Sequence, residues 1–264
     1  MEKIVLFCKS YKGDIERFKI QAESVRNHNR DNIPFYICIP KSDKNLFDPI
    51  VKKCNIKVFF DEDISNLTSE QSHFTQQLFK IEFMRSSNVA KHYFLMDSDM
   101  YFIKDFSISD FFNNGVPYMT MHECKDLLEY SYLIHGDNRI NEWFVGERKP
   151  IMELFGRKGK YYDYSGSANL YIADVFVRLY NDYCKPNNLN FLDLLKHCSS
   201  ENTWYGEYAL ATNTPFYPCG PMFKTFHYPW QYKNHKQLGI TMEMISKNYL
   251  GITMQSNWGS PLKY

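Results

Sequence analysis

Short apolar runs alternate with helical segments over the first hundred residues, and this alternation is the feature that most constrains the fold. The runs typical of buried strands are residues 4–8, 35–39, 56–60 and 93–96. The segments between them with helical spacing of apolar residues are 14–27, about 43–53 and 71–86. Strands that alternate with helices form β-α-β units, so we expect an α/β fold with a mainly parallel central sheet and helices on both faces.

The second half of the chain is less regular, and it contains no repeat or low-complexity linker. Strands are expected at 116–121 and 166–172, and helices at 138–155, 174–198 with a break at Pro186, and 201–211. In the helix at 71–86 we expect four residues to pack inward: Phe74, Leu78, Ile81 and Phe83. From residue 214 the chain is rich in Pro, Gly and aromatic residues. A chain of 264 residues is long enough for one large core, and we predict one domain over 1–264.

Two carboxylates follow the fourth predicted strand, since Asp97 and Asp99 flank Ser98 directly after an apolar run. Open α/β sheets place ligand sites at the edge where such strands end. Extended backbone would direct both acidic side chains to one side, where they could share a hard divalent cation and its phosphate. The alternative is that the two acids only cap a turn.

Composition excludes several classes of partner. The formal net charge is +1 and the basic residues are dispersed, so we expect no nucleic-acid binding. Seven scattered cysteines without a metal-ligand spacing suggest a reducing compartment, and we expect a cytoplasmic protein. No apolar run approaches the ~20 residues of a membrane span, and the first residues are typical of a strand rather than a signal peptide. Peripheral membrane contact through the aromatic tail stays open.

The order of these elements resembles the GT-A glycosyltransferases, which use a nucleotide-sugar donor and a D-x-D motif. Three segments carry the resemblance: 95–102 around the two acids, 76–81 (Gln76-Gln77-Leu78-Phe79-Lys80-Ile81), and 200–208 (Ser200-Glu201-Asn202-Thr203-Trp204-Tyr205-Gly206-Glu207-Tyr208). The last segment and the opening loop 9–14 are similar to a group of bacterial transferases, the DUF6492-like group. The resemblance implies a single Rossmann-like GT-A domain, with 1–102 binding nucleotide-sugar and metal and 103–264 binding the acceptor.

The activity implied by the resemblance is metal-dependent glycosyl transfer. The donor would be a UDP-, GDP- or dTDP-sugar with Mn²⁺ or Mg²⁺, and the acceptor a glycan or glycolipid, as in bacterial surface polysaccharide or lipopolysaccharide synthesis. Asp99 would ligate the metal, and Asp97 would hold the metal or the ribose. A further ligand near the C-terminus would be His227, for which hydrogen bonding in an aromatic cluster is an equally ordinary role.

Transfer with inversion needs a general base, normally a carboxylate, and the candidates are Glu201 and Glu207. Six residues apart on one helix, they cannot face the same spot, and the resemblance favours Glu201. Its alternative role is that of a helix N-terminal acid. Lys80 could reach a phosphate or be an ordinary surface lysine. The remaining candidates for donor binding are Ser10, Tyr11, Asp61, Gln77, Ser98, Gly166 and Ser167, and the aromatic tail could form an acceptor platform with Tyr228, Trp230, Tyr232 and Trp258.

Two other functions fit parts of the pattern. Phosphatases of the haloacid dehalogenase type also carry D-x-D after a strand, but normally after the first strand and followed by Thr or Val. Here the motif follows the fourth strand and continues with Met100 and Tyr101. A non-catalytic GT-A scaffold that binds a sugar, nucleotide or protein is the second alternative, against which the intact acids and Lys80 argue.

Overall fold

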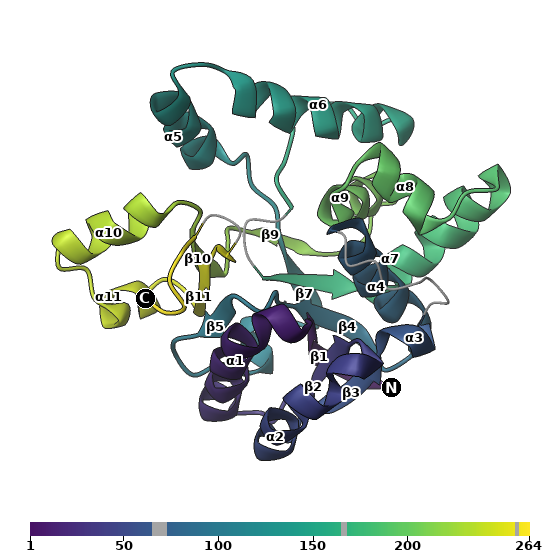
Figure 1. Ribbon diagram of the computed structural model, residues 1–264. Helices are drawn as coiled ribbons and strands as arrows, with labels where there is room; N and C mark the ends of the chain where they lie inside the picture. Colours follow the sequence, from purple (N-terminus) through teal and green to yellow (C-terminus); the bar gives the residue numbers. More distant parts are fainter. Residues whose placement is uncertain (65–72, 165–167, 257–258) are drawn as a thin grey trace.

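A five-stranded sheet forms the centre of the computed structural model, which describes residues 1–64, 73–164, 168–256 and 259–264 (Figure 1). Its strands are β1 (Glu2–Lys9), β2 (Phe35–Ile39), β3 (Lys57–Phe60), β4 (Ala90–Leu95) and β8 (Asn169–Ile172). They lie in the order β3-β2-β1-β4-β8, where the first four are parallel and β8 is antiparallel to β4. The prediction of an α/β fold with a mainly parallel sheet is therefore confirmed.

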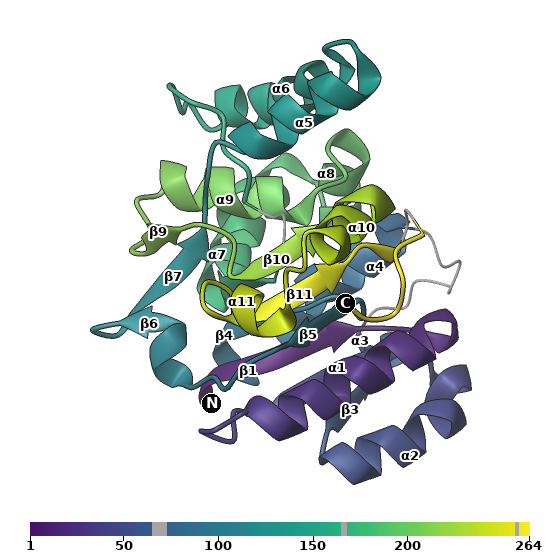
Figure 2. The same cartoon turned by 90° about the vertical axis from the view of Figure 1, so that its left-hand side faces the viewer.

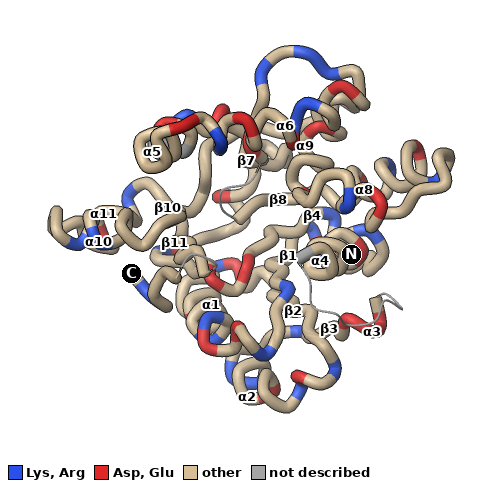
Figure 3. The backbone as a smooth tube through the Cα atoms, turned by 45° about the horizontal axis from the view of Figure 1, so that its top comes forward, with Lys and Arg blue, Asp and Glu red and all other residues tan. Residues whose placement is uncertain are grey.

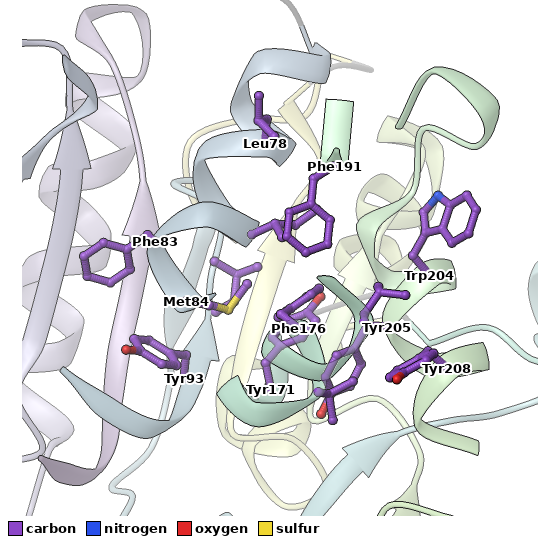
Figure 4. Packing of buried hydrophobic residues seen from close by; sticks show 14 of the residues in the cluster. Leu78, Phe83, Met84, Tyr93, Tyr171, Phe176, Phe191, Trp204, Tyr205 and Tyr208 are labelled. Carbon is purple, nitrogen blue, oxygen red and sulfur yellow. The ribbon is translucent and has the colours of Figure 1, made fainter. Parts of the chain in front are cut away.

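Helices cover both faces of this sheet, because alternate residues of each strand point to opposite sides. In β1, Leu6 and Cys8 pack with α1 (Ile15–His28) and α2 (Lys44–Cys54) in one core. Val5 and Phe7 belong to the other core, to which α4 (His73–Ser86), α7 (Ala173–Arg178), α8 (Phe191–His197) and α9 (Glu201–Ala211) contribute. Figure 4 shows this second core, where the ring centroids of Tyr171 and Tyr205 lie 4.7 Å apart.

Two smaller sheets each combine strands from the middle of the chain with strands from its C-terminal part. One has the order β10-β11-β5, and Figure 2 shows it beside β1; its strands are β5 (Met100–Phe102), β10 (Phe223–Phe226) and β11 (Gly251–Met254). The other has the order β6-β7-β9, with β6 (Phe112–Asn113), β7 (Val116–Thr120) and β9 (Tyr217–Cys219). The remaining helices are α3 (Asp61–Ile64), α5 (Lys125–His135), α6 (Arg139–Leu154), α10 (Pro229–Gln237) and α11 (Met242–Ser246).

Most predicted elements of the second half are present, including the interrupted helical stretch. It consists of α7, a π-helical turn at Leu179–Cys184, a short 3-10 turn at Lys185–Asn187 and α8, so the chain breaks at Pro186 as expected. The prediction for Phe74 is wrong, since 39% of its surface is exposed. Phe74 lies in the first turn of α4, which becomes buried only from Gln77 onward. Among the described residues, no helix combines the length and apolar composition needed to cross a bilayer.

Candidate active site

A polar cavity of about 390 Å³ lies where β1, β4 and β11 end, and we call it the Asp97 cavity. The end of β1, the loop after it and the first turn of α1 contribute Lys9, Tyr11, Asp14 and Arg17 to its lining. Helix α4 contributes Gln76, Gln77 and Lys80, the segment after β4 contributes Asp97, Ser98 and Asp99, and the segment after β11 contributes Gln255 and Ser256. Figure 3 shows acidic positions between β11 and β1, near the centre of the molecule. Carboxyl ends of parallel strands are the expected place for a ligand site in such a sheet.

Asp97 and Asp99, the two carboxylates of the D-x-D motif, both line this cavity, but a turn rather than extended backbone brings them there. The extended backbone ends with β4, because the Met100 N–H donates to the Asp97 carbonyl oxygen at 3.0 Å and closes a turn. The turn still places Asp97 and Asp99 in one lining. The Asp99 carboxylate accepts a hydrogen bond from the Ser256 N–H at 2.9 Å. The backbone carbonyl oxygen of Asp99 accepts one from the Met254 N–H, also at 2.9 Å.

Asp99 is held in a site that disfavours its charged form. Only 8% of the residue is exposed, and burial together with the charge of Asp97 raises the pKa of the Asp99 carboxyl to about 6. The Asp97 carboxylate is half exposed and forms an ion pair with Lys80, whose Nζ lies 2.6 Å from Oδ1. A cation beside Asp99 would therefore lower the cost of ionising it.

Lys80 is a buried cation between two acids. Its Nζ also lies 3.8 Å from Oε1 of Glu201, and only 3% of Lys80 is exposed. Burial alone would lower the pKa of Lys80, but the charges of Asp97 and Glu201 outweigh it and raise the pKa above its ordinary value. A surface lysine, the alternative that the sequence left open, does not describe this position.

The two candidate bases face different surroundings, as their helical spacing predicts. Glu201 begins α9, which Ser200 caps by accepting a hydrogen bond from the Thr203 N–H at 3.2 Å. Glu201 lies behind Lys80, is 3% exposed and has a pKa raised by burial. Glu207 is fully buried: Arg157 forms an ion pair with it, with Nη2 2.7 Å from Oε1, and the Tyr164 hydroxyl donates to Oε1 at 2.8 Å. Neither acid is among the described residues that line the Asp97 cavity, but Glu201 contacts one that is.

The predicted donor-binding residues divide into a lining set and a supporting set. Tyr11, Gln77, Lys80 and Ser98 line the cavity. Ser10 accepts a hydrogen bond from the Ser98 hydroxyl at 2.9 Å. Asp61 is buried, lies 3.0 Å from Nζ of the lining residue Lys9, and accepts from the Cys38 thiol at 3.0 Å. Ser10 and Asp61 thus hold lining residues in place from behind.

His227 does not line the Asp97 cavity. It lines a second cavity of about 620 Å³, where Asp163, Lys224 and His122 are its charged and titratable neighbours. Within the described ranges, no group of three or more His, Cys, Asp or Glu side chains is arranged to hold a metal ion. The candidates Gly166, Ser167 and Trp258 lie outside the described residues.

Several cavity residues escaped the sequence analysis. Asp14 and Arg17 sit three residues apart at the start of α1, so their place after β1 was a usable signal. Gln255 and Ser256 carried no such signal, because only the pairing of β11 with β5 brings them beside Asp99.

Comparisons with known proteins agree with this fold. A sequence model described as a family of unknown function, DUF6492, matches residues 3–142, just over half of the chain. The crystal structure of mouse xyloside xylosyltransferase 1 in its apo form is similar with a TM-score of 0.52 at 7% sequence identity. That similarity covers 98% of this chain and 100% of the other, and it shows a glycosyltransferase fold. No curated protein matches the sequence.

Proposed function

The chain belongs to the DUF6492 family, and we propose that it is a metal-dependent glycosyltransferase that uses a nucleotide-sugar donor. The observation that carries the proposal is the Asp97 cavity. In a glycosyltransferase fold, two carboxylates and a buried lysine meet there at the carboxyl ends of β1 and β4. This combination suits the diphosphate of a donor together with a divalent cation.

The charge of the lining supports joint binding of metal and diphosphate. Among the described lining residues, three acids face three cations: Asp14, Asp97 and Asp99, with Lys9, Arg17 and Lys80. A balanced lining favours neither a divalent cation alone nor a diphosphate alone. The two together bring charges of opposite sign, so each should strengthen the binding of the other.

The donor atoms of this cavity fit a hard divalent cation. Mg²⁺ is usually bound through one or two carboxylates and the phosphates of the substrate, and Asp97 and Asp99 offer two carboxylates in one lining. The raised pKa of Asp99 fits as well, because a neighbouring cation favours the ionised carboxyl. When bound, Mn²⁺ or Mg²⁺ would supply a Lewis acid that offsets the charge of the leaving diphosphate.

The protein's own residues have separable roles in the proposal. Lys80 donates to the phosphates as a fixed positive charge, while Tyr11 and Gln77 line the place of the nucleotide. Glu201 is the proposed base of an inverting transfer, because it is the acid of the Ser200-Glu201 pair that the resemblance favours and it lies beside the cavity residue Lys80. Its contact with Lys80 supports a positioning role as well. Glu207 is not part of this assignment, because Arg157 and Tyr164 already engage it.

The acceptor in this proposal is a glycan or glycolipid of bacterial surface polysaccharide or lipopolysaccharide synthesis, and the protein acts in the cytoplasm. The support for the acceptor is the resemblance of residues 9–14 and 200–208 to bacterial transferases. The support for the cytoplasm is that the seven cysteines are free, as in a reducing compartment.

A thermal-shift panel tests the proposal directly. UDP, GDP and dTDP are each added with and without Mn²⁺ to the wild type, to Asp99→Asn and to the control Glu243→Gln on α11. One nucleotide should stabilise the wild type and the control only with metal, by about 2.7 kcal/mol at a hundred times its dissociation constant. No shift with any nucleotide would refute the proposal. A shift without hydrolysis of the matching nucleotide-sugar would indicate a non-catalytic binding protein.

A further inference from the structure

The pair of helices α10 and α11 presents an exposed surface that the function proposed above does not use. Figure 1 shows the two helices at one edge of the molecule, and Figure 2 shows them on the face turned toward the viewer. Their inner side packs on the small sheet β10-β11-β5, where Ile240 and Ile245 share a cluster with Phe226. The outer side, which we call the α10–α11 surface, is exposed, and its lysines and large apolar side chains are Lys233, Lys236, Leu238, Met242, Met244 and Lys247.

Large apolar side chains on this surface are in contact with water. The exposed fractions are 75% for Leu238, 40% for Met242 and 50% for Met244. The segment 259–264 adds Leu262, which is 47% exposed. This segment lies against the turn between the two helices, because the Tyr264 hydroxyl donates to the Ile240 carbonyl oxygen at 2.6 Å. Exposed apolar side chains that gather in one place mark a contact with an apolar partner.

The same region is positively charged in a chain that is otherwise slightly acidic. Residues 229–264 contain four lysines and one acid, Glu243, whereas residues 1–228 contain 27 Lys and Arg against 29 Asp and Glu. All four lysines are exposed, and the fourth, Lys263, precedes Tyr264 in the segment that lies against the turn. Exposed lysines among exposed Leu and Met match an anionic lipid surface, which attracts the ammonium groups and takes up the apolar side chains.

Other exposed apolar side chains of the molecule lack this charge. Helices α5 and α6 expose Leu133 and Trp143, but residues 125–154 carry four Lys and Arg against six Asp and Glu. An anionic surface would repel these helices. A nucleic acid or an acidic protein would match the lysines of the α10–α11 surface, but neither accounts for the exposure of Leu238 and Met244. Charge and apolar exposure together therefore favour a lipid surface.

We propose that the α10–α11 surface docks on an anionic lipid bilayer, with Leu238 and Met244 entering the interface and the lysines contacting lipid phosphates. The surface adjoins the Asp97 cavity, because Arg17 lines that cavity and donates to the Ser260 carbonyl oxygen at 2.9 Å in the segment 259–264. Docking therefore holds the cavity close to the membrane, where a glycolipid acceptor lies. This consequence rests on the proposed glycosyltransferase function, whereas the docking does not.

Vesicle flotation of the full chain, without nucleotide or metal, tests the docking. The probes are vesicles of phosphatidylcholine alone and of an equal mixture of phosphatidylcholine and phosphatidylglycerol. We expect the wild type to bind the mixed vesicles, and to bind them more weakly as the salt concentration rises. Binding to phosphatidylcholine alone should be at least about tenfold weaker.

Three sets of substitutions separate the contributions of charge and apolar contact. The lysine pair, Lys233→Gln with Lys247→Gln, removes two charges and should weaken binding to the mixed vesicles about thirtyfold. The apolar pair, Leu238→Gln with Met244→Gln, should weaken it at least about tenfold. Glu243→Gln removes the one acid of residues 229–264 and should tighten binding about fivefold, a gain that a misfolded protein could not give.

The matched control is Leu46→Gln with Lys52→Gln on α2, which replaces an exposed leucine and an exposed lysine elsewhere and should bind as the wild type does. The docking is overturned if the wild type does not float with the mixed vesicles, or if the control loses as much binding as the two pairs do. Weaker binding of the lysine pair with no change in the apolar pair would also overturn it and would indicate an acidic macromolecule as the partner.

The nucleotide panel and the flotation assay fail independently of each other. Vesicle binding without any nucleotide shift in the thermal panel would refute the proposed function and leave the docking intact. A nucleotide shift without vesicle binding would refute the docking and leave the proposed function intact.

Discussion

Replacing Gly206 on α9 with alanine should destabilise the protein, whereas the same substitution at an ordinary helical glycine is stabilising. A methyl group on Gly206 would lie 2.2 Å from two ring carbons of Tyr164, whereas ordinary contact begins near 3.4 Å. The Tyr164 ring has no room to withdraw, because it is fully buried and its hydroxyl donates to Glu207 at 2.8 Å. The close approach of helix and ring therefore depends on the missing side chain.

The magnitude follows from three contributions to the free energy of unfolding. Alanine in place of glycine stabilises a helix interior by about 1 kcal/mol. Overpacking a full core costs about 1–3 kcal/mol, and weakening a hydrogen bond to a charged acceptor costs about 1.5–3 kcal/mol. Gly206→Ala should therefore lower the free energy of unfolding by about 1.5–5 kcal/mol. The matched control is Gly146→Ala on α6. Among the described residues, nothing outside the helix's own adjoining backbone lies within 4 Å of the added methyl group, and we expect the variant to be neutral or stabilised by up to about 1 kcal/mol.

Urea unfolding followed by circular dichroism measures both variants. A Gly206→Ala protein as stable as the wild type would refute the reasoning. A second check combines Gly206→Ala with Tyr164→Leu. The smaller side chain relieves the contact, so the glycine substitution should cost at least about 1 kcal/mol less in that background. Strictly additive effects would mean that the ring and the glycine do not interact as the structure indicates.

Three further predictions concern charged groups. Arg157→Met leaves the fully buried Glu207 without its ion-pair partner and should lower the free energy of unfolding in urea by about 3–5 kcal/mol. Much of this loss should be recovered when Glu207→Gln is added, and a loss below about 1 kcal/mol for Arg157→Met alone would contradict the prediction. The pKa of Asp99, raised from 3.8 to about 6, implies stability that is present below about pH 4 and lost as pH rises through about 6. In EDTA, Asp99→Asn should therefore gain up to about 3 kcal/mol over the wild type at about pH 7.5 and little at about pH 4, and a constant difference would argue against it. Lys80→Met should weaken binding of the stabilising nucleoside diphosphate with Mn²⁺ at least about tenfold in the thermal-shift assay, whereas the exposed control Lys53→Met should not.

The sequence predicted the central sheet well because each of its strands carries its own signal. Residues 4–8 and 35–39 are apolar on both faces, as buried parallel strands must be, and both are strands in the structure. Helix α9 was predicted with its observed bounds, 201–211, and in the structure Ser200 supplies a local cap before it. Such signals lie within a few residues and need no knowledge of the rest of the chain.

The C-terminal part could not be predicted in this way, because its strands are defined by distant partners. Strand β11 pairs with β5, about 150 residues earlier in the chain, and a four-residue strand carries little periodicity of its own. The same pairing brings Ser256 to Asp99 and places His227 on the far side of Gln255. The prediction of His227 as a metal ligand beside the two acids depended on how these distant strands pair. The sequence alone does not show that pairing.

For Glu201 and Glu207, helical periodicity predicts the relative direction of the two side chains but not their chemical roles. Six residues amount to about 600° of rotation, which correctly separates the two side chains to different faces of α9. Periodicity does not predict which face of α9 lies toward the Asp97 cavity, because the cations that pack on the two faces, Lys80 and Arg157, come from other segments of the chain. Arg157 turns Glu207 into half of a buried ion pair, while Lys80 links Glu201 to Asp97. The role of an acid on this helix is therefore decided by the cation that packs against its face.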